Sequence, residues 1–231
     1  MGNIYLVRHG QASFGAADYD NLSELGRRQS VRLGQYLQES GLQFEAVMTG
    51  TLKRHLQTFA GICEGIGGGG DGAPGKTLPA ALPWPGLNEF DGEAVIKALH
   101  PPALQDPTTP EGYKQHFHLL RDGLCQWMSG VISPLGMPNY PDFVLGVTSA
   151  LAHVRKSHTG NVLIVSSGGP ISTAVGHILG TTPETTIALN MRIRNSAITE
   201  LVYNPKRCTL QTFNTLPHLD GAQYAPWVTY S

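Results

Sequence analysis

The stretch Ile4-Tyr5-Leu6-Val7-Arg8-His9-Gly10 decides the fold class of this chain. Its first four residues form a short apolar run, which is typical of a strand covered on both faces in an α/β sheet. Ligands of such sheets bind in the crevice outside the carboxyl ends of the strands. Arg8 and His9 follow the strand at that end. We therefore expect a permanent cation and a nitrogen nucleophile or base at the ligand-binding edge.

The composition limits the class of protein. The chain has 231 residues, of which 41% are hydrophobic, enough for one well-packed core with a small insertion. Its formal net charge of −1 provides no bulk attraction to nucleic acid or anionic lipid. No apolar run approaches the ~18 residues of a membrane span. Cys63, Cys125 and Cys208 lie far apart without a C-x-x-C pair, which fits reduced thiols. We expect a cytoplasmic protein with no membrane and no nucleic-acid partner.

Strand and helix patterns alternate along the chain, which favours βαβ units and a mainly parallel sheet. The predicted strands are 4–7, 44–48, 78–82, 162–165, 197–203 and 209–213, the last two closing the sheet with a possible antiparallel edge. The predicted helices are 24–39, 51–63, 111–128, 142–157 and 170–179. Ser23 is the candidate N-cap of the first helix and Gly41 closes it. The pattern predicts a three-layer α/β/α fold, with residues 1–231 as one domain and residues 86–142 as a lid insertion.

Polar segments follow the other predicted strands at the same edge of the sheet. They are Gly50–Thr58, which contains Arg54, Leu87–Gly92, which contains Glu89, and Ser166–Pro170. With Arg8-His9-Gly10 in front and Asn214–Leu219 behind, this ordered set resembles the histidine phosphatase superfamily, which has the phosphoglycerate-mutase-like fold. The resemblance covers nearly the whole chain.

The resemblance implies a phosphoryl-transfer site without a metal or cofactor. Arg8 and Arg54 would bind the phosphate, because guanidinium forks match phosphate oxygens where lysine cannot. His9 would be the nucleophile that forms a phosphohistidine. Gly10 would let the backbone approach the phosphate, and Ser13 would be a minor substrate contact.

Glu89 would be the general acid that protonates the leaving oxygen, a task that needs a carboxyl group with a raised pKa. Asp91 and Glu93 lie close in sequence and are alternatives. The family pattern of leucine, any residue and glutamate favours Glu89.

Ser167 departs from the family, which usually has a second histidine at this position. A charged hydrogen bond contributes roughly 1.5–3 kcal/mol and a neutral one about 0.5–1.5 kcal/mol, a difference of ~10-fold in rate. The amides of Ser167 and Gly168 precede a predicted helix, whose N-terminus can bind an anion and offset part of the loss. An alternative is that another histidine, such as His158 or His218, occupies the place of the missing one.

Two further departures bear on the reaction. Residues Gln11–Gly15 replace the Glu-Ser-x-x-Asn run that mutases of the family carry, and Gly169 replaces an asparagine that they often have. Hydrolysis of a phosphomonoester is therefore expected over phosphoglycerate mutase activity, weakened or specialised by Ser167. The competing interpretation is an inactive relative that only binds a phosphoryl ligand. The partner would be a small phosphorylated substrate or phosphate ion, and the oligomeric state stays open.

Three other patterns are not taken as sites. Gly70–Thr77 has the spelling of a nucleotide P-loop, but it follows a helix and precedes a proline-rich segment that cannot continue as one. His116 and His118 do not share a helix face, as a metal pair would require. Ser167 lacks the Gly-x-Ser-x-Gly context of a serine hydrolase.

Overall fold

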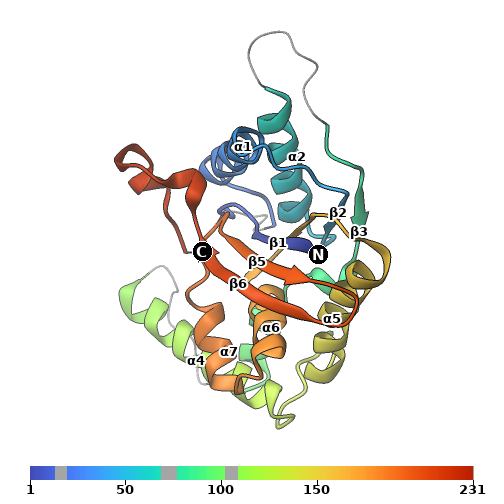
Figure 1. The fold of residues 1–231 in the computed structure, drawn as a ribbon. Coiled ribbons are helices and arrows are strands. Elements are labelled where there is room, and N and C mark those ends of the chain that lie inside the picture. Colours follow the sequence, from blue (N-terminus) through green and yellow to red (C-terminus); the bar gives the residue numbers. More distant parts are fainter. Residues whose placement is uncertain (14–19, 69–76, 102–108, 231) are drawn as a thin grey trace.

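The computed structural model describes residues 1–13, 20–68, 77–101 and 109–230. Six strands form one sheet in the order β3-β2-β4-β1-β5-β6 (Figure 1). They are β1 (Gly2–Arg8), β2 (Ala46–Thr49), β3 (Ala81–Pro83), β4 (Val162–Ser166), β5 (Ile198–Tyr203) and β6 (Cys208–Thr215). The first four strands are parallel, whereas β5 is antiparallel to both β1 and β6. The predicted sheet with an antiparallel edge is confirmed.

Helices cover both faces of this sheet. The α-helices are α1 (Glu24–Glu39), α2 (Lys53–Gly67), α3 (Gly92–Lys97), α4 (Pro110–Met128), α5 (Tyr140–Ser157), α6 (Gly168–Leu179) and α7 (Pro183–Asn190). Short 3₁₀ helices are η1 (Pro85–Leu87), η2 (Pro217–Leu219) and η3 (Ala222–Trp227). In Figure 1, α1 and α2 lie on one side of the sheet, and α4, α5, α6 and α7 lie on the other.

The alternation of side chains along β1 builds a core on each face. Tyr5 and Val7 pack with the α1 and α2 side, whereas Ile4 and Leu6 belong to the core beneath α5 and α6. Successive residues of a strand point to opposite faces, so a continuous apolar run supplies both cores. β4 lies between β1 and β2 and is buried along its whole length. The α/β/α layering follows from this arrangement.

The helix ends explain which boundaries could be predicted. α1 begins and ends at the predicted residues, because the Ser23 side chain accepts a hydrogen bond from the Gly26 amide and Gly41 turns with a φ of 67°. α2 extends to Gly67 and so includes the start of the predicted glycine loop, residues 65–75. The eight-residue α7 was not predicted, since its sequence carries few apolar residues to mark a face.

The stretch 86–142 contributes to the core. α3 is an element that the sequence did not predict, whereas α4 matches the predicted helix to within one residue at its start. Trp127 is buried and its ring lies 5.3 Å from the ring of Phe143 and 5.8 Å from that of Phe90. The lid role of this stretch stays a prediction.

Some sequence features fall outside the described residues. Residues 70–76 of the P-loop-like spelling, Phe14 and Gly15 of the loop after Arg8-His9-Gly10, and residues 102–108 belong to this group. Among the helices that the structure does describe, none combines the length and apolar character needed to cross a membrane.

Candidate active site

The carboxyl ends of the parallel strands meet around the end of β4. The His9 amide donates to the Ser166 carbonyl at 2.9 Å, and the Gly50 amide donates to the Val165 carbonyl at 3.0 Å. The Ser166 hydroxyl donates to the Leu87 carbonyl at 2.7 Å. The segments that follow β1, β2, η1 and β4 are thereby held together at one edge of the sheet, where ligands of such sheets bind.

The His9 ring is held in one tautomer. Its Nδ1 atom lies 2.7 Å from the carbonyl oxygen of Gly10, and a carbonyl can only accept, so Nδ1 carries the proton. The backbone of His9 is also fixed, because its carbonyl accepts from the Ser196 amide at 3.1 Å. Ser196 has a φ of 58°, a left-handed conformation that is uncommon for a residue with a side chain. The neutral ring therefore has its lone pair on Nε2.

Burial keeps His9 in this neutral state. Only 3% of the residue is exposed, and its pKa is lowered well below the ordinary value. Burial is the largest cause, and the charges of Arg8 and Arg54 and the neighbouring His55 lower the pKa further. Both guanidinium groups act electrostatically on this ring. A buried imidazole beside two permanent cations remains unprotonated near neutral pH and is available as a nucleophile or base.

The two arginines reach the site from different elements. Arg8 is the last residue of β1, and its Nη1 donates to the carbonyls of Ile193 and Tyr230, the latter at 2.7 Å. Arg54 lies in the first turn of α2 and is 7% exposed, and its Nη1 is 2.7 Å from Asp20 Oδ1. Although they are distant in the sequence, both charges act on the His9 ring and on the Glu89 carboxyl group.

Thr58 connects these elements. Its hydroxyl oxygen accepts from the Gly10 amide at 3.1 Å and donates to the Arg54 carbonyl at 2.7 Å. Gly10 itself packs against α1, since a Cβ atom there would lie 2.3 Å from the Gly26 carbonyl oxygen. Close packing against α1 is thus a structural reason for glycine at this position.

Glu89 lies at the N-terminus of α6. Both of its carboxylate oxygens lie 3.1 Å from the Gly169 amide nitrogen, which donates to them. Burial raises the pKa of this carboxyl group, although the Gly169 amide and the charges of Arg54 and Arg8 act in the opposite direction. The same two arginine charges act on His9, and a buried carboxyl group with a raised pKa has the property required of a general acid.

The alternatives to Glu89 have other partners. Asp91 caps α3 by accepting from the Ala94 amide at 3.0 Å. Glu93 is exposed and pairs with Lys97 at 3.2 Å. Glu89, in contrast, is buried where the charges of Arg54 and Arg8 act on it, so it is the better candidate for the acidic group of the site.

Ser167 faces a histidine that the sequence analysis did not consider. Its Oγ atom lies 2.7 Å from His55 Nε2, and both residues are fully buried. The two histidines considered for this place lie elsewhere: His158 pairs with Glu45 at 3.0 Å, and His218 Nε2 lies 2.9 Å from Ser196 Oγ. The neighbour of Ser167 thus comes from α2.

His55 is also close to the candidate nucleophile. The ring centroids of His9 and His55 are 5.8 Å apart. Burial, followed by the charge of Arg54, lowers the pKa of His55 to about 3. The ring is therefore neutral at physiological pH and adds no positive charge to the site.

The start of α6 has fewer free amide donors for an anion than the sequence suggests. The Gly169 amide donates a hydrogen bond to Glu89, and Pro170 has no amide proton. This terminus therefore offers a phosphoryl group the amide of Gly168. The Ser13 amide donates to the Asn21 carbonyl at 2.8 Å, and among the described residues no contact joins Ser13 to His9.

The site residues missed by the sequence analysis are His55, Thr58 and Ser196. His55 and Thr58 lie within the same segment as Arg54, so their place on the first turns of α2 was a usable signal. Ser196 carried none, because its conformation is visible only in the structure. Within the described ranges, no group of three or more His, Cys, Asp or Glu residues could hold a metal ion.

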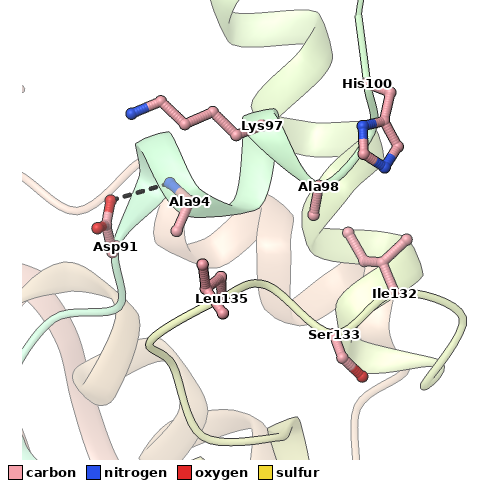
Figure 2. A pocket seen from close by; sticks show the side chains of 8 residues that line it. All are labelled: Asp91, Ala94, Lys97, Ala98, His100, Ile132, Ser133 and Leu135. Atoms are coloured by element: carbon pink, nitrogen blue, oxygen red, sulfur yellow. Dashed lines mark hydrogen bonds between the residues drawn. The ribbon is translucent and has the colours of Figure 1, made fainter.

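A separate hollow lies beside α3. Figure 2 shows its walls, formed by α3 and by the segment after α4. The cavity has a volume of about 580 Å³ and is lined by Asp91, Ala94, Lys97, Ala98, His100, Ile132, Ser133 and Leu135. None of these residues belongs to the cluster around His9, so the hollow is distinct from the candidate active site.

The chain matches the family description "Histidine phosphatase superfamily (branch 1)" over residues 4–216. It therefore belongs to the histidine phosphatase superfamily, as the ordered motifs indicated.

Solved structures share the fold along nearly the whole chain. A mycobacterial glucosyl-3-phosphoglycerate phosphatase, solved as a VO3 complex, is 19% identical with a TM-score of 0.65 over 93% of this chain and 100% of that one. A phosphoserine phosphatase from Entamoeba histolytica, in complex with 3-phosphoglyceric acid, is 19% identical with a TM-score of 0.63 over 95% and 100%. An alpha-ribazole phosphatase from Shigella flexneri is 21% identical with a TM-score of 0.61 over 93% and 96%. At these identities the likeness concerns the fold.

Proposed function

We propose that this protein is a phosphatase that hydrolyses a phosphomonoester through a phosphohistidine at His9. The observation that carries the proposal is the state of the His9 ring. Its proton is held on Nδ1 by the Gly10 carbonyl, its Nε2 lone pair is unprotonated, and two guanidinium charges act on it. A neutral imidazole beside fixed cations suits attack on a dianionic phosphoryl group.

In the first step, His9 Nε2 forms a bond to phosphorus while the bond from phosphorus to the leaving oxygen breaks. Glu89, whose pKa is raised by burial, donates a proton to that oxygen. Arg8 and Arg54 balance the charge on the non-bridging oxygens, and the Gly168 amide and the Ser167 hydroxyl add neutral donors.

In the second step, a water molecule attacks phosphorus and gives a proton to the Glu89 carboxylate. The bond between phosphorus and Nε2 breaks, orthophosphate is released, and both side chains return to their initial states. The same carboxyl group thus acts first as an acid and then as a base.

The comparisons support phosphoryl transfer over unrelated chemistry. The superfamily and the similar structures comprise phosphatases and mutases. Hydrolysis is the better proposal than mutase activity, because Gln11–Gly15 and Gly169 both depart from the mutase pattern. The substrate is a small phosphorylated compound, whose variable part would lie against the predicted lid, residues 86–142.

The second candidate function is binding of a phosphoryl ligand without turnover. The observation that favours it is the neutral Ser167 in place of the histidine that the family usually has. Arg8, Arg54 and Gly168 would still bind an oxyanion in such a protein.

Hydrolysis of p-nitrophenyl phosphate by the full chain and by His9→Ala separates the two candidates. We expect phosphate release by the unmodified protein and a loss of about 10³-fold or more in His9→Ala. His177→Ala, which removes an exposed histidine of α6, is the matched control and should keep the rate. Radiolabelled substrate should leave an acid-labile, alkali-stable label on the protein that His9→Ala lacks. Binding of orthovanadate without any turnover would overturn the phosphatase proposal in favour of the binder.

A further inference from the structure

The Ser167 hydroxyl does not cap the helix that it precedes. Ser167 is the N-cap residue of α6, yet its side chain makes no capping hydrogen bond. A capping serine accepts from the amide of the second or third helical residue. Here the second is Gly169, whose amide bonds Glu89, and the third is Pro170, which has no amide proton. Ordinary helix capping therefore does not account for this serine.

The hydroxyl bonds His55 instead, across a fully buried contact. The 2.7 Å distance between Ser167 Oγ and His55 Nε2 joins the end of β4 to the first turn of α2. Arg54 precedes His55 in the chain, and the His9 ring lies 5.8 Å from the His55 ring. The pair thus lies close to the candidate nucleophile, on the same turn of α2 as a candidate phosphate ligand.

The surroundings of His55 Nδ1 indicate which nitrogen carries the proton. Nδ1 is buried and has no hydrogen-bond partner among the described residues. It faces Gly50, where a Cβ atom would lie 2.1 Å away, so the hydrogen that glycine carries in that direction points at Nδ1. A lone pair fits against a C–H group, whereas an N–H proton would collide with it and be left unsatisfied. The proton is therefore on Nε2, which donates to Ser167 Oγ.

We propose that His55 is a positioning residue whose Nε2–H fixes the Ser167 hydroxyl so that its own proton points to the phosphoryl group. The proposal rests on the proposed phosphatase function and assigns the place of the family's second histidine to a pair from two elements. A hydroxyl that accepts from Nε2 has its proton left to donate, and accepting one bond strengthens the donation of the other. Arg8 and Arg54 then supply the positive charge, and the His55–Ser167 pair orients a hydrogen-bond donor toward the phosphoryl group.

The same contact changes the expectation for Ser167→His. On sequence grounds, this substitution restores the family residue and is expected to accelerate the reaction. In the structure, His55 fills the space beside Ser167, and neither residue is exposed. A second imidazole at position 167 requires that the first be removed.

Kinetics of paired variants in the full chain test the proposal. His55→Leu removes the donor at similar volume, and His55→Gln keeps an amide donor. With p-nitrophenyl phosphate, we expect His55→Leu and Ser167→Ala each to lower kcat about 10-fold or more, with KM changed less than about 3-fold. His55→Gln should retain kcat within about 3-fold, and the double variant His55→Leu/Ser167→Ala should lose no more than either single one. Additive losses, or equal losses in His55→Gln and His55→Leu, would overturn the proposal.

A second set of variants tests the exchange of one histidine for another. Ser167→His alone should lower kcat, and His55→Ala/Ser167→His should recover at least about 5-fold over it, because the new ring gains the vacated space. His158→Gln is the control: the ring of His158 pairs with Glu45 at 3.0 Å, and these residues precede β4 and β2, at the opposite edge of the sheet from His9. It should change kcat less than about 2-fold. No recovery in the double variant counts against the proposal.

Ligand binding separates this proposal from the phosphatase function itself. If the unmodified protein shows no turnover, the proposed function fails. Calorimetry with orthovanadate and orthophosphate then tests the Ser167–His55 pair without any need for turnover. Ser167→Ala should then weaken the binding of orthovanadate at least about 3-fold more than the binding of orthophosphate. The reason is that a fixed donor favours the trigonal bipyramidal geometry that bound vanadate adopts. Equal weakening overturns the positioning role. If His55→Leu does not fold, Ser167→Ala, which removes only one oxygen atom, replaces it in the kinetic test.

Discussion

Both carboxylate oxygens of Glu89 lie 3.1 Å from the amide nitrogen of Gly169. A Cβ atom at Gly169 would come within 2.0 Å of Glu89 Oε1, so any other residue would displace the carboxylate. The departure from the asparagine of the mutases at this position thus has a structural reason: glycine makes room for the candidate general acid. The buried carboxyl group accepts from two amides, that of Gly169 and that of Phe90, which lies 3.2 Å from Oε1.

Gly169→Ala should therefore act on the proton transfer to the leaving group. We expect kcat for an alkyl phosphate such as glycerol phosphate to fall by about 10²-fold, in the range attributed to general acids. The loss for p-nitrophenyl phosphate should be much smaller, because p-nitrophenolate leaves without a proton. Glu89→Gln should show the same dependence on the leaving group. Gly67→Ala is the control, since nothing lies within 4 Å of a Cβ there. Equal losses on both substrates would contradict this role of Gly169.

Thr58→Val should destabilise the protein through the hydrogen bonds that join Gly10 to α2. The valine leaves the Gly10 amide without its acceptor, which costs about 1–3 kcal/mol of the free energy of unfolding. Thr49→Val is a stringent control, because Thr49 is equally buried and its hydroxyl has no partner among the described residues. Urea unfolding should show the loss in Thr58→Val and no loss, or a gain, in Thr49→Val. Similar losses in both would show that the Thr58 bonds contribute little.

Asp20→Asn should strengthen the binding of orthophosphate. The carboxylate lies 2.7 Å from Arg54 Nη1, so it competes with a ligand for this guanidinium and repels an incoming dianion. We expect the inhibition constant of orthophosphate to fall by about 3- to 10-fold, or ~0.7–1.4 kcal/mol. Glu64→Gln, which removes the exposed pair with Arg27, should leave it unchanged. Weaker binding in Asp20→Asn would instead show that Asp20 holds Arg54 in place for the ligand.

The buried histidines should make folding sensitive to acid. The pKa of both His55 and His218 is lowered to about 3, mainly by burial. The charge of Arg54 lowers the pKa of His55 further, and that of Arg32 does the same for His218. In the unfolded chain their pKa is about 6.5, so between that pH and about 3 the unfolded state binds more protons. Their contribution is fully present above pH ~6.5 and is lost as the pH falls, by up to ~1.4 kcal/mol per pH unit for each histidine.

His218→Gln measures this effect directly. Urea unfolding at pH 7.5, 6.0 and 5.0 should give a shallower decline in the variant than in the unmodified protein, by about one proton. The comparison of the two chains cancels the opposite contribution of Glu89, whose raised pKa favours the folded state in acid. Parallel declines would mean that His218 titrates alike in the folded and unfolded chains.

The fold was predictable to the extent that local signals agreed with the tertiary structure. α1 has the predicted ends because Ser23 and Gly41 act within one turn of the helix. β1 and β4 are apolar runs whose burial on both faces follows from their central place in the sheet. α3 and α7 were missed because six and eight residues are too few to show a period.

The site residues at the end of β1 were predictable from the strand pattern, whereas Arg54 and Glu89 were named through the family resemblance. Arg8 and His9 extend β1, so the edge they occupy follows from the strand itself. The pairing of His55 with Ser167 joins residues 112 positions apart, and no spacing along the chain encodes it. His218 and His158 were considered as substitutes for the missing histidine on residue type alone, and each has a different partner.

The Tyr230 carbonyl, which accepts from Arg8 Nη1 at 2.7 Å, has a practical consequence for handling the protein. An affinity tag attached downstream of Tyr230 would follow a residue that bonds Arg8, the proposed phosphate ligand, and the tag's own carboxylates or histidines would compete for this guanidinium. Met1, 92% exposed at the opposite end of β1, is the safer attachment point, and kinetics should be compared between proteins tagged at either terminus.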